Sequence, residues 1–162
     1  MSPSTTTTKT TSATRGSGAF TTEEKAAMKA RAAEARAEER ASRSAAKAAE
    51  KAEEDRAACE AKIAELDDAD RVLCERLHAV ITTNAPGLAP RLYYGMPAYA
   101  KDGAVLCFVQ PAAKFGTRYA TLGFTDVAML DDGSFWPNAW AITTLTAADE
   151  EEVAALVRRA VG

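Results

Sequence analysis

Histidine, aromatic side chains and long apolar runs are all scarce in this sequence of 162 residues, which has one histidine and 7% aromatic residues. A single histidine excludes any metal site that needs several imidazole ligands. The chain also has no Gly-x-Ser-x-Gly element, no P-loop and no Gly-x-Gly-x-x-Gly motif, the usual markers of serine hydrolases, nucleotide hydrolases and dinucleotide enzymes. Because no catalytic motif is present, we expect a protein that is not an enzyme.

Signals for export and for the membrane are missing from the sequence as well. No apolar run approaches the ~18 to 20 residues that a membrane span needs, and the N-terminus lacks the apolar segment of a secretory signal. The three cysteines are an odd number at wide spacing, so they do not form a disulfide framework. We therefore expect a cytoplasmic protein that does not associate with membranes.

Charge is distributed unevenly along the chain, whose net charge is −3. Residues 1–20 carry two basic residues and no acidic one, and residues 21–58 carry equal numbers of each sign. Residues 59–162 carry nine basic and fourteen acidic residues. This acidic part disfavours nucleic acid as a partner, although Lys114 to Tyr119 does interleave cations with aromatic residues.

Large apolar residues are absent from residues 29–62, which contain no Val, Ile, Leu, Met, Phe, Trp or Tyr. Residues 1–20 are rich in Ser and Thr, which predicts a disordered tail. Residues 21–58 are mostly Ala, Glu, Lys and Arg, which are strong helix formers, and Thr21 with Glu24 forms a capping-box pattern. We expect an exposed helical arm here, either simply solvated or docking a protein partner.

Residues 59–162 have the pattern of a small α+β domain. An apolar stripe and a cap predict a helix from Asp67 to about Thr83. Strand-like runs follow at residues 91–94, 104–110, 117–124 and 136–145. A second capping pattern, Thr146 with Asp149, opens a helix that continues to the end of the chain. The order of elements predicts an antiparallel sheet backed by helices from both ends of the domain.

The run Tyr93-Tyr94-Gly95-Met96-Pro97-Ala98-Tyr99, with the later Cys107-Phe108, Lys114 and Leu122-Gly123-Phe124, resembles the YdhG-like domains. This bacterial family of unassigned function is similar to frataxin and related to an iron chaperone. The run Leu130-Asp131-Asp132-Gly133 with Trp136-Pro137, and Phe20-Thr21 with Glu24 and Met28, resemble an actinobacterial-type subset of the family. The resemblance implies a frataxin-like α+β fold and iron as a candidate cargo. Gly95 and Pro97 predict that the motif itself is a bent or interrupted edge strand.

Metal binding has two sets of candidates. Asp67, Asp68 and Asp70 offer clustered carboxylates for iron or another hard cation, although carboxylates at a helix start also serve as caps. Cys74 and His78 are four residues apart on the same predicted helix, a spacing that suits a transition metal. The simpler interpretation of that pair is a buried thiol and a histidine at the core boundary.

Binding of a small ligand is the remaining possibility. An apolar pocket with one cation would use candidates grouped around the YdhG-like motif: Tyr94, Gly95, Met96, Pro97, Tyr99, Lys114, Tyr119 and Trp136, with Phe108 and Trp140 beside them. The same residues would equally well form the rim of the core. The sequence thus leaves three hypotheses: a carrier of iron or a small ligand, a module that binds proteins through residues 21–58, and, with least support, an enzyme with an unrecognised pocket.

Overall fold

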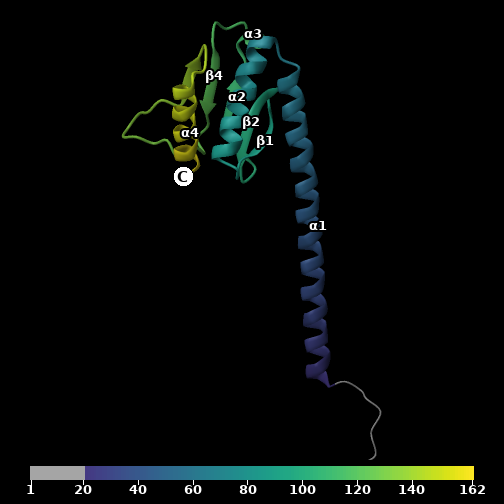
Figure 1. Ribbon diagram of the computed structural model, residues 1–162. Coiled ribbons are helices and arrows are strands. Elements are labelled where there is room, and N and C mark those ends of the chain that lie inside the picture. The colour runs from purple at the N-terminus through teal and green to yellow at the C-terminus, as the bar shows by residue number, and fades with distance from the viewer. Residues whose placement is uncertain (1–20) are drawn as a thin grey trace, which may run out of the picture. The chain divides into compact units, whose positions relative to one another are not determined.

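The computed structural model describes residues 21–162, and the disordered tail expected at residues 1–20 lies outside them. The chain divides between Ser44 and Ala45 into two units. Helix α1 (Thr22–Ala64) belongs to both units and passes residues 58 and 59 without a break (Figure 1). Within residues 21–162, no helix is long and apolar enough to cross a membrane.

Capping and tertiary packing together set the helix boundaries. In α1 the side chain of Thr21 accepts a hydrogen bond from the amide of Glu24, and the Glu24 carboxylate accepts one from the Thr21 amide, as the sequence predicted. Residues 22–54 of α1 are exposed, whereas Cys59 and Ile63 are buried. These two apolar contacts explain why the helix continues beyond the end expected near Ala58.

The predicted α+β class is confirmed by a five-stranded antiparallel sheet, in which the strands follow one another in the order β1-β2-β3-β4-β5. The remaining elements are α2 (Asp68–Asn84), β1 (Ala89–Tyr93), β2 (Met96–Lys101), β3 (Ala104–Gln110), α3 (Ala112–Phe115), β4 (Ala120–Phe124), β5 (Ala139–Ile142) and α4 (Ala147–Val161). β4 and β5 are shorter than the runs predicted at 117–124 and 136–145. Thr117 instead closes the turn after α3, because its amide donates to the Ala112 carbonyl.

The motif of residues 93–99 does not form the bent edge strand that we expected. Tyr94 and Gly95, with φ angles of 48° and 72°, make the tight turn that joins β1 to β2, and Tyr93 pairs with Met96 across it. Two consecutive positive φ angles match the twist of a two-residue hairpin. Pro97 lies in β2, a strand that is paired on both sides. The motif is therefore a hairpin.

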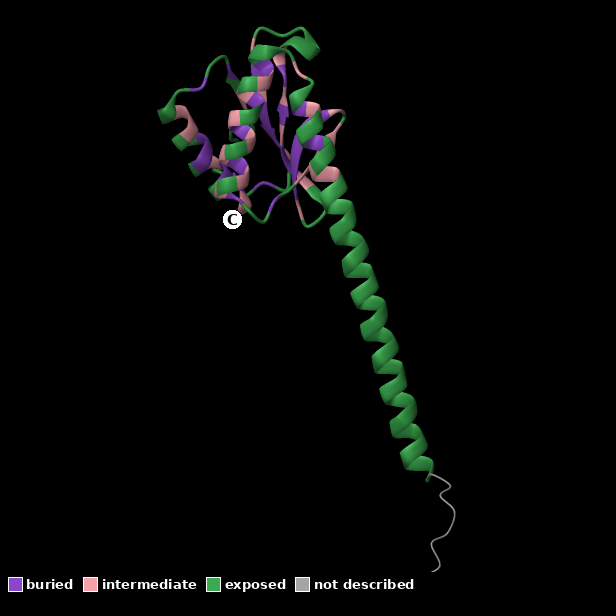
Figure 2. Cartoon of the chain, turned by 45° about the vertical axis from the view of Figure 1, so that its right-hand side comes forward, coloured by how far each residue is buried: buried purple, intermediate pink, exposed green. Residues whose placement is uncertain are grey.

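The core of the unit from Ala45 onward lies between the sheet and the helices. Helices α2 and α4 contact each other over one face of the sheet, and buried residues line that face and the helix sides turned toward it (Figures 1 and 2). Leu77 and Ile81 of α2 and Val157 of α4 pack there with Tyr99 and Leu122 of the sheet, and all of them are fully enclosed. The apolar stripes recognised in the sequence are the helix sides that build this core.

Candidate functional site: a groove between helix α4 and strand β5

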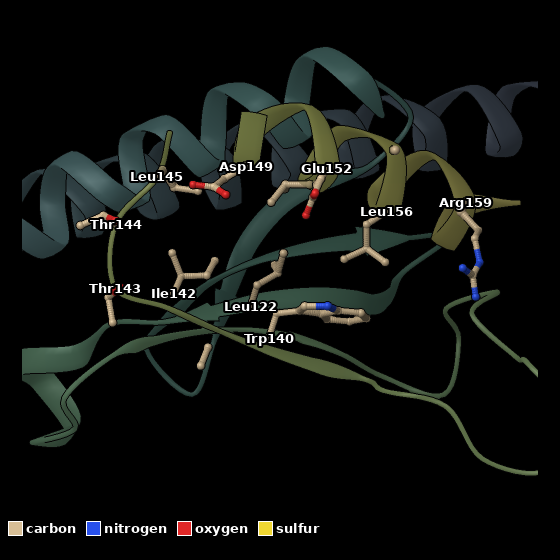
Figure 3. A pocket seen from close by; sticks show the side chains of 13 residues that line it. Leu122, Trp140, Ile142, Thr143, Thr144, Leu145, Asp149, Glu152, Leu156 and Arg159 are labelled. Carbon is tan, nitrogen blue, oxygen red and sulfur yellow. The ribbon is translucent and has the colours of Figure 1, made fainter. Parts of the chain in front are cut away.

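A groove with a volume of about 630 Å³ runs between α4 and the β4–β5 side of the sheet (Figure 3). It is lined by Leu122, by residues 140–145, and by Asp149, Glu152, Val153, Ala155, Leu156 and Arg159 of α4. Its volume falls in the range of about 300 to 1,000 Å³ that is typical of sites for small molecules.

The floor of the groove is apolar because of strand alternation and register. Trp140 pairs with Leu122 across β4 and β5, so their side chains lie on the same face of the sheet, turned toward Leu156 of α4 (Figure 3). The Trp140 ring also packs edge-on against Phe124 at a centroid distance of 5.5 Å. This contact holds the indole in place, while Trp140 keeps part of its surface exposed.

Three charged side chains of α4 stand at the groove, and two of them have partners. Asp149 completes the capping box with Thr146, and hydrogen bonds from the Thr146 amide and hydroxyl lower the pKa of its carboxyl group. Arg159 donates to the Leu130 carbonyl at 3.0 Å. Glu152 makes no side-chain hydrogen bond or ion pair with any other residue of 21–162, so its carboxylate is available to a ligand (Figure 3).

This arrangement suits an elongated apolar molecule that carries a positive charge. The Trp140 face and the aliphatic floor provide contact area for an alkyl or aromatic body. The Glu152 carboxylate at the wall provides an ionic partner for an ammonium or guanidinium group.

The ligand candidates that the sequence suggested lie elsewhere. Tyr94 is 83% exposed in its turn, and Gly95 accepts a hydrogen bond at its carbonyl from Lys114 Nζ at 2.8 Å. Met96, Pro97 and Tyr99 are buried in β2. None of these residues lines the groove.

The last two candidates near the motif are also outside the groove. The guanidinium carbon of Arg118 lies over the ring of Tyr119, 5.1 Å from the ring centroid. Trp136 lies in the β4–β5 loop. Of the aromatic residues considered from the sequence, only Trp140 is part of the groove.

Tyr99 is instead the buried end of a polar link that runs through His78 to Glu60 at the surface. Its hydroxyl lies 3.0 Å from His78 Nδ1, and His78 Nε2 lies 3.8 Å from a Glu60 carboxylate oxygen. Burial raises the pKa of Tyr99 well above its usual value and lowers the pKa of His78. Both side chains are therefore neutral at pH 7, and the link joins α1, α2 and β2.

The three aspartates proposed for iron do not act together. Asp70 is buried, and its carboxylate oxygens accept hydrogen bonds from the amides of Ala112 and Ala113 at 3.1 and 2.8 Å. Asp68, whose side chain is 91% exposed, pairs with Arg71. Asp67 and Asp70 do line a smaller hollow of about 280 Å³ beside Lys114. In the described part of the chain, no group of three or more His, Cys, Asp or Glu side chains could hold a metal ion.

The three cysteines are all buried in the core and unpaired. Burial raises the pKa of Cys59 to about 11 and the pKa values of Cys74 and Cys107 to about 12. These groups are thiols rather than thiolates at neutral pH, so they are poor nucleophiles and poor metal ligands. The pattern of Cys74 and His78 thus reflects core packing, with His78 turned to Tyr99.

Glu152, Leu156 and Arg159 were not recognised as site residues from the sequence. The acidic residues in the first turn of α4 and the basic residues in its last turn are already explained by the helix dipole, and Leu156 lies beside the apolar residues that face the core. Spacing of three and four residues from Asp149 through Glu152 and Leu156 to Arg159 places them on one side of α4, next to the stripe of Val153 and Val157. This combination of charged and apolar residues on one side of the helix is the sequence signal that could have identified the site.

No protein-family model, curated protein or solved structure matches this chain. The groove is therefore the feature from which a function can be inferred.

Proposed function

We propose that this protein is a non-enzymatic binding protein whose groove between α4 and β5 takes an elongated apolar ligand with a positively charged group. The observation that carries the proposal is the position of an ion-pair-free carboxylate, Glu152, in the wall of a groove floored by Trp140, Leu122 and Ile142. The motif around Tyr94-Gly95 and the α+β fold support placing the chain with the YdhG-like domains.

Iron is not the ligand that we propose. The Asp70 carboxylate already accepts two amide hydrogen bonds, so binding a cation there would compete with the anchoring of α3. In the groove, the Asp149 carboxylate is engaged in the capping box, which leaves Glu152 as the one carboxylate without a partner in residues 21–162, whereas a hard cation takes six or more oxygen ligands.

Burial of an alkyl chain provides the expected affinity. Each methylene transferred from water contributes about 0.8 kcal/mol, and an ion pair with the exposed Glu152 carboxylate adds up to about 1 kcal/mol. A chain of about six to eight carbon atoms with a terminal amine should therefore bind measurably, whereas shorter chains should not.

The test uses octylamine and the fluorescence of Trp140. The chain contains two tryptophans, so the variant Trp136→Phe leaves Trp140, which lines the groove, as the reporter. We expect a saturable fluorescence change with octylamine and a weaker one with octanoate, because Glu152 repels a carboxylate. Glu152→Gln should remove the preference for the amine, and Glu151→Gln, a neighbouring exposed carboxylate that does not line the groove, should keep it.

A second variant separates groove binding from adsorption elsewhere. Ala155 is exposed and lines the groove, so Ala155→Trp fills it without disturbing the core. Octylamine should no longer saturate in an Ala155→Trp variant that still unfolds cooperatively. Equal binding by this variant and its parent would overturn the proposed site.

A further inference from the structure

Strand β5 has a free side along which backbone groups point outward. β5 is the last strand of the sheet and pairs with β4 alone among the described strands. The Phe124 amide donates to the Asn138 carbonyl at 2.8 Å, so Asn138 is hydrogen-bonded to β4, and by alternation so are Trp140 and Ile142. The N–H and C=O groups of Ala139, Ala141 and Thr143 consequently point away from β4.

The two edges of the sheet differ in how they are protected. β1, at the other edge, contains Pro90, which has no amide hydrogen, and Arg91, which is charged. Proline and charged residues are common means by which edge strands avoid pairing with other chains. β5 reads Ala139-Trp140-Ala141-Ile142 and contains neither, and its pairing with β4 has no bulge. The edge next to the groove is thus the one left open to an added strand.

The groove lies where the side chains of an added strand would fall. Residues 140–145 line one side of the groove, and Glu152 and Leu156 of α4 line the other (Figure 3). A peptide extended along β5 would direct alternate side chains toward α4, just as Trp140 and Ile142 do. Strand addition beside a groove combines backbone hydrogen bonds for affinity with side-chain pockets for specificity.

We propose that the groove binds an extended, basic peptide segment, which adds to the sheet as a sixth strand along β5. Its backbone pairs with Ala139, Ala141 and Thr143, its alternate apolar side chains contact Trp140 and Leu156, and one Lys or Arg side chain pairs with Glu152. The charge of the partner follows from the free Glu152 carboxylate and from the net negative charge of residues 59–162. This inference depends on the proposed function, because it names the class of ligand for the same groove.

The probe is the fluorescent peptide acetyl-Thr-Leu-Thr-Lys-Thr-Leu-Thr-amide, titrated by anisotropy into the full chain. Its even-numbered positions carry Leu, Lys and Leu for the groove. Two methylated peptides carry N-methyl groups either on the odd or on the even positions. In strand addition one set of amides faces β5 and the other faces solvent, so we expect at least a tenfold loss of affinity in one series and little change in the other.

Protein variants test the edge and the charge separately. Ala141→Pro removes an outward amide without breaking the pairing with β4, and it should abolish peptide binding, whereas Ala141→Val keeps the amide and should bind. Glu152→Lys should reverse the preference, so that the peptide with Glu in place of Lys binds more tightly than the original.

The outcomes distinguish this inference from the proposed function. If octylamine saturates but the peptide does not, or if both methylated series lose affinity equally, the peptide inference fails and the groove remains a small-molecule site. If neither probe binds, the proposed function fails as well. If sedimentation shows that the protein alone forms a dimer that Ala141→Pro abolishes, a second copy occupies this edge and the peptide inference is overturned.

Discussion

The hydroxyl of Tyr99 lies 3.0 Å from Nδ1 of His78, which joins the middle of the sheet to helix α2 inside the core. His78 is the only histidine in the chain. Its pKa is lowered chiefly by burial, and among nearby charges Glu60 raises it while Arg56 lowers it. This single group therefore governs how stability responds to pH just below neutrality.

Stability should decrease as the pH falls from about 6.5, the ordinary pKa of histidine in an unfolded chain. In this window the unfolded chain binds a proton that the folded chain, with its lowered pKa, does not yet bind. The slope has an upper limit of about 1.4 kcal/mol per pH unit. Urea unfolding between pH 7 and 5.5 measures it. His78→Gln should flatten the curve and Glu60→Gln should steepen it, and identical curves for His78→Gln and wild type would contradict the assignment.

Replacing Asp70 with alanine should destabilise the protein by about 1 to 2 kcal/mol, the usual effect of losing a capping side chain. The variant leaves the amides of Ala112 and Ala113, which now bond to the Asp70 carboxylate, without their partner. Asp68→Ala is the matched control, because it removes an exposed ion pair with Arg71 and should change stability by less than about 0.5 kcal/mol. Equal effects of the two substitutions in urea unfolding would refute the role of Asp70.

Gly123→Ala should destabilise the sheet by about 1 to 3 kcal/mol, the range for overpacking. A methyl group at this position would overlap the ring of Phe108, which lies opposite Gly123 across β3 and β4. The ring would have to tilt from its contact with Tyr93, at a centroid distance of 5.6 Å. Gly87→Ala, which meets nothing within 4 Å, is the control.

A double-mutant cycle identifies the source of the Gly123→Ala effect. In a Phe108→Ala background there is no ring to displace, so the same glycine substitution should have little effect. An undiminished effect in that background would place the strain elsewhere.

Tyr94→Asn should stabilise the protein by up to about 1 kcal/mol, because a bulky residue with positive φ is strained and Asn-Gly is a preferred pair for this turn. Tyr94 has a φ of 48° and precedes Gly95. Tyr94→Phe keeps the strain and should leave the thermal midpoint unchanged. Because Tyr94 does not line the groove, octylamine binding should be the same in both variants. A lower midpoint for Tyr94→Asn would show that the tyrosine ring stabilises the turn.

A chain that begins at Ala45 should keep the stability and the octylamine affinity of the full protein. The groove residues and the core all lie within residues 45–162. Urea unfolding and Trp140 fluorescence measure the two quantities, and a large loss in either would contradict the division at Ser44. The hypothesis that residues 21–58 dock a protein partner stays a prediction, which a pull-down with a chain that lacks residues 1–58 tests.

Much of the fold was predictable because helix signals are local. The stripe of Leu77 and Ile81 and the capping box of Thr146 with Asp149 each lie within two helical turns, and both were identified correctly. The hairpin at Tyr94 was not, because its turn uses a bulky residue where Asn or Gly is usual. The pairing of β1 with β2 holds Tyr94 at a positive φ angle that a tyrosine does not favour on its own.

The groove was less predictable because it depends on two segments meeting in space. β5 has only four residues, and the charged residues at the start of α4 are already explained by the capping box and the helix dipole. Nothing in the sequence around Trp140 indicates that Glu152 lies across from it. The contribution of Trp140 could be guessed from its residue type, whereas that of Glu152 required knowledge of how α4 packs against the sheet.

The buried thiols of Cys59, Cys74 and Cys107 can report on partial unfolding of this protein. They belong to α1, α2 and β3, so reagents reach all three only when two helices separate from the sheet. Since these buried thiols are not ionised in the folded protein, the rate of alkylation depends on how often the protein unfolds locally or globally. The order in which the three cysteines are alkylated would therefore show which helix separates from the sheet first.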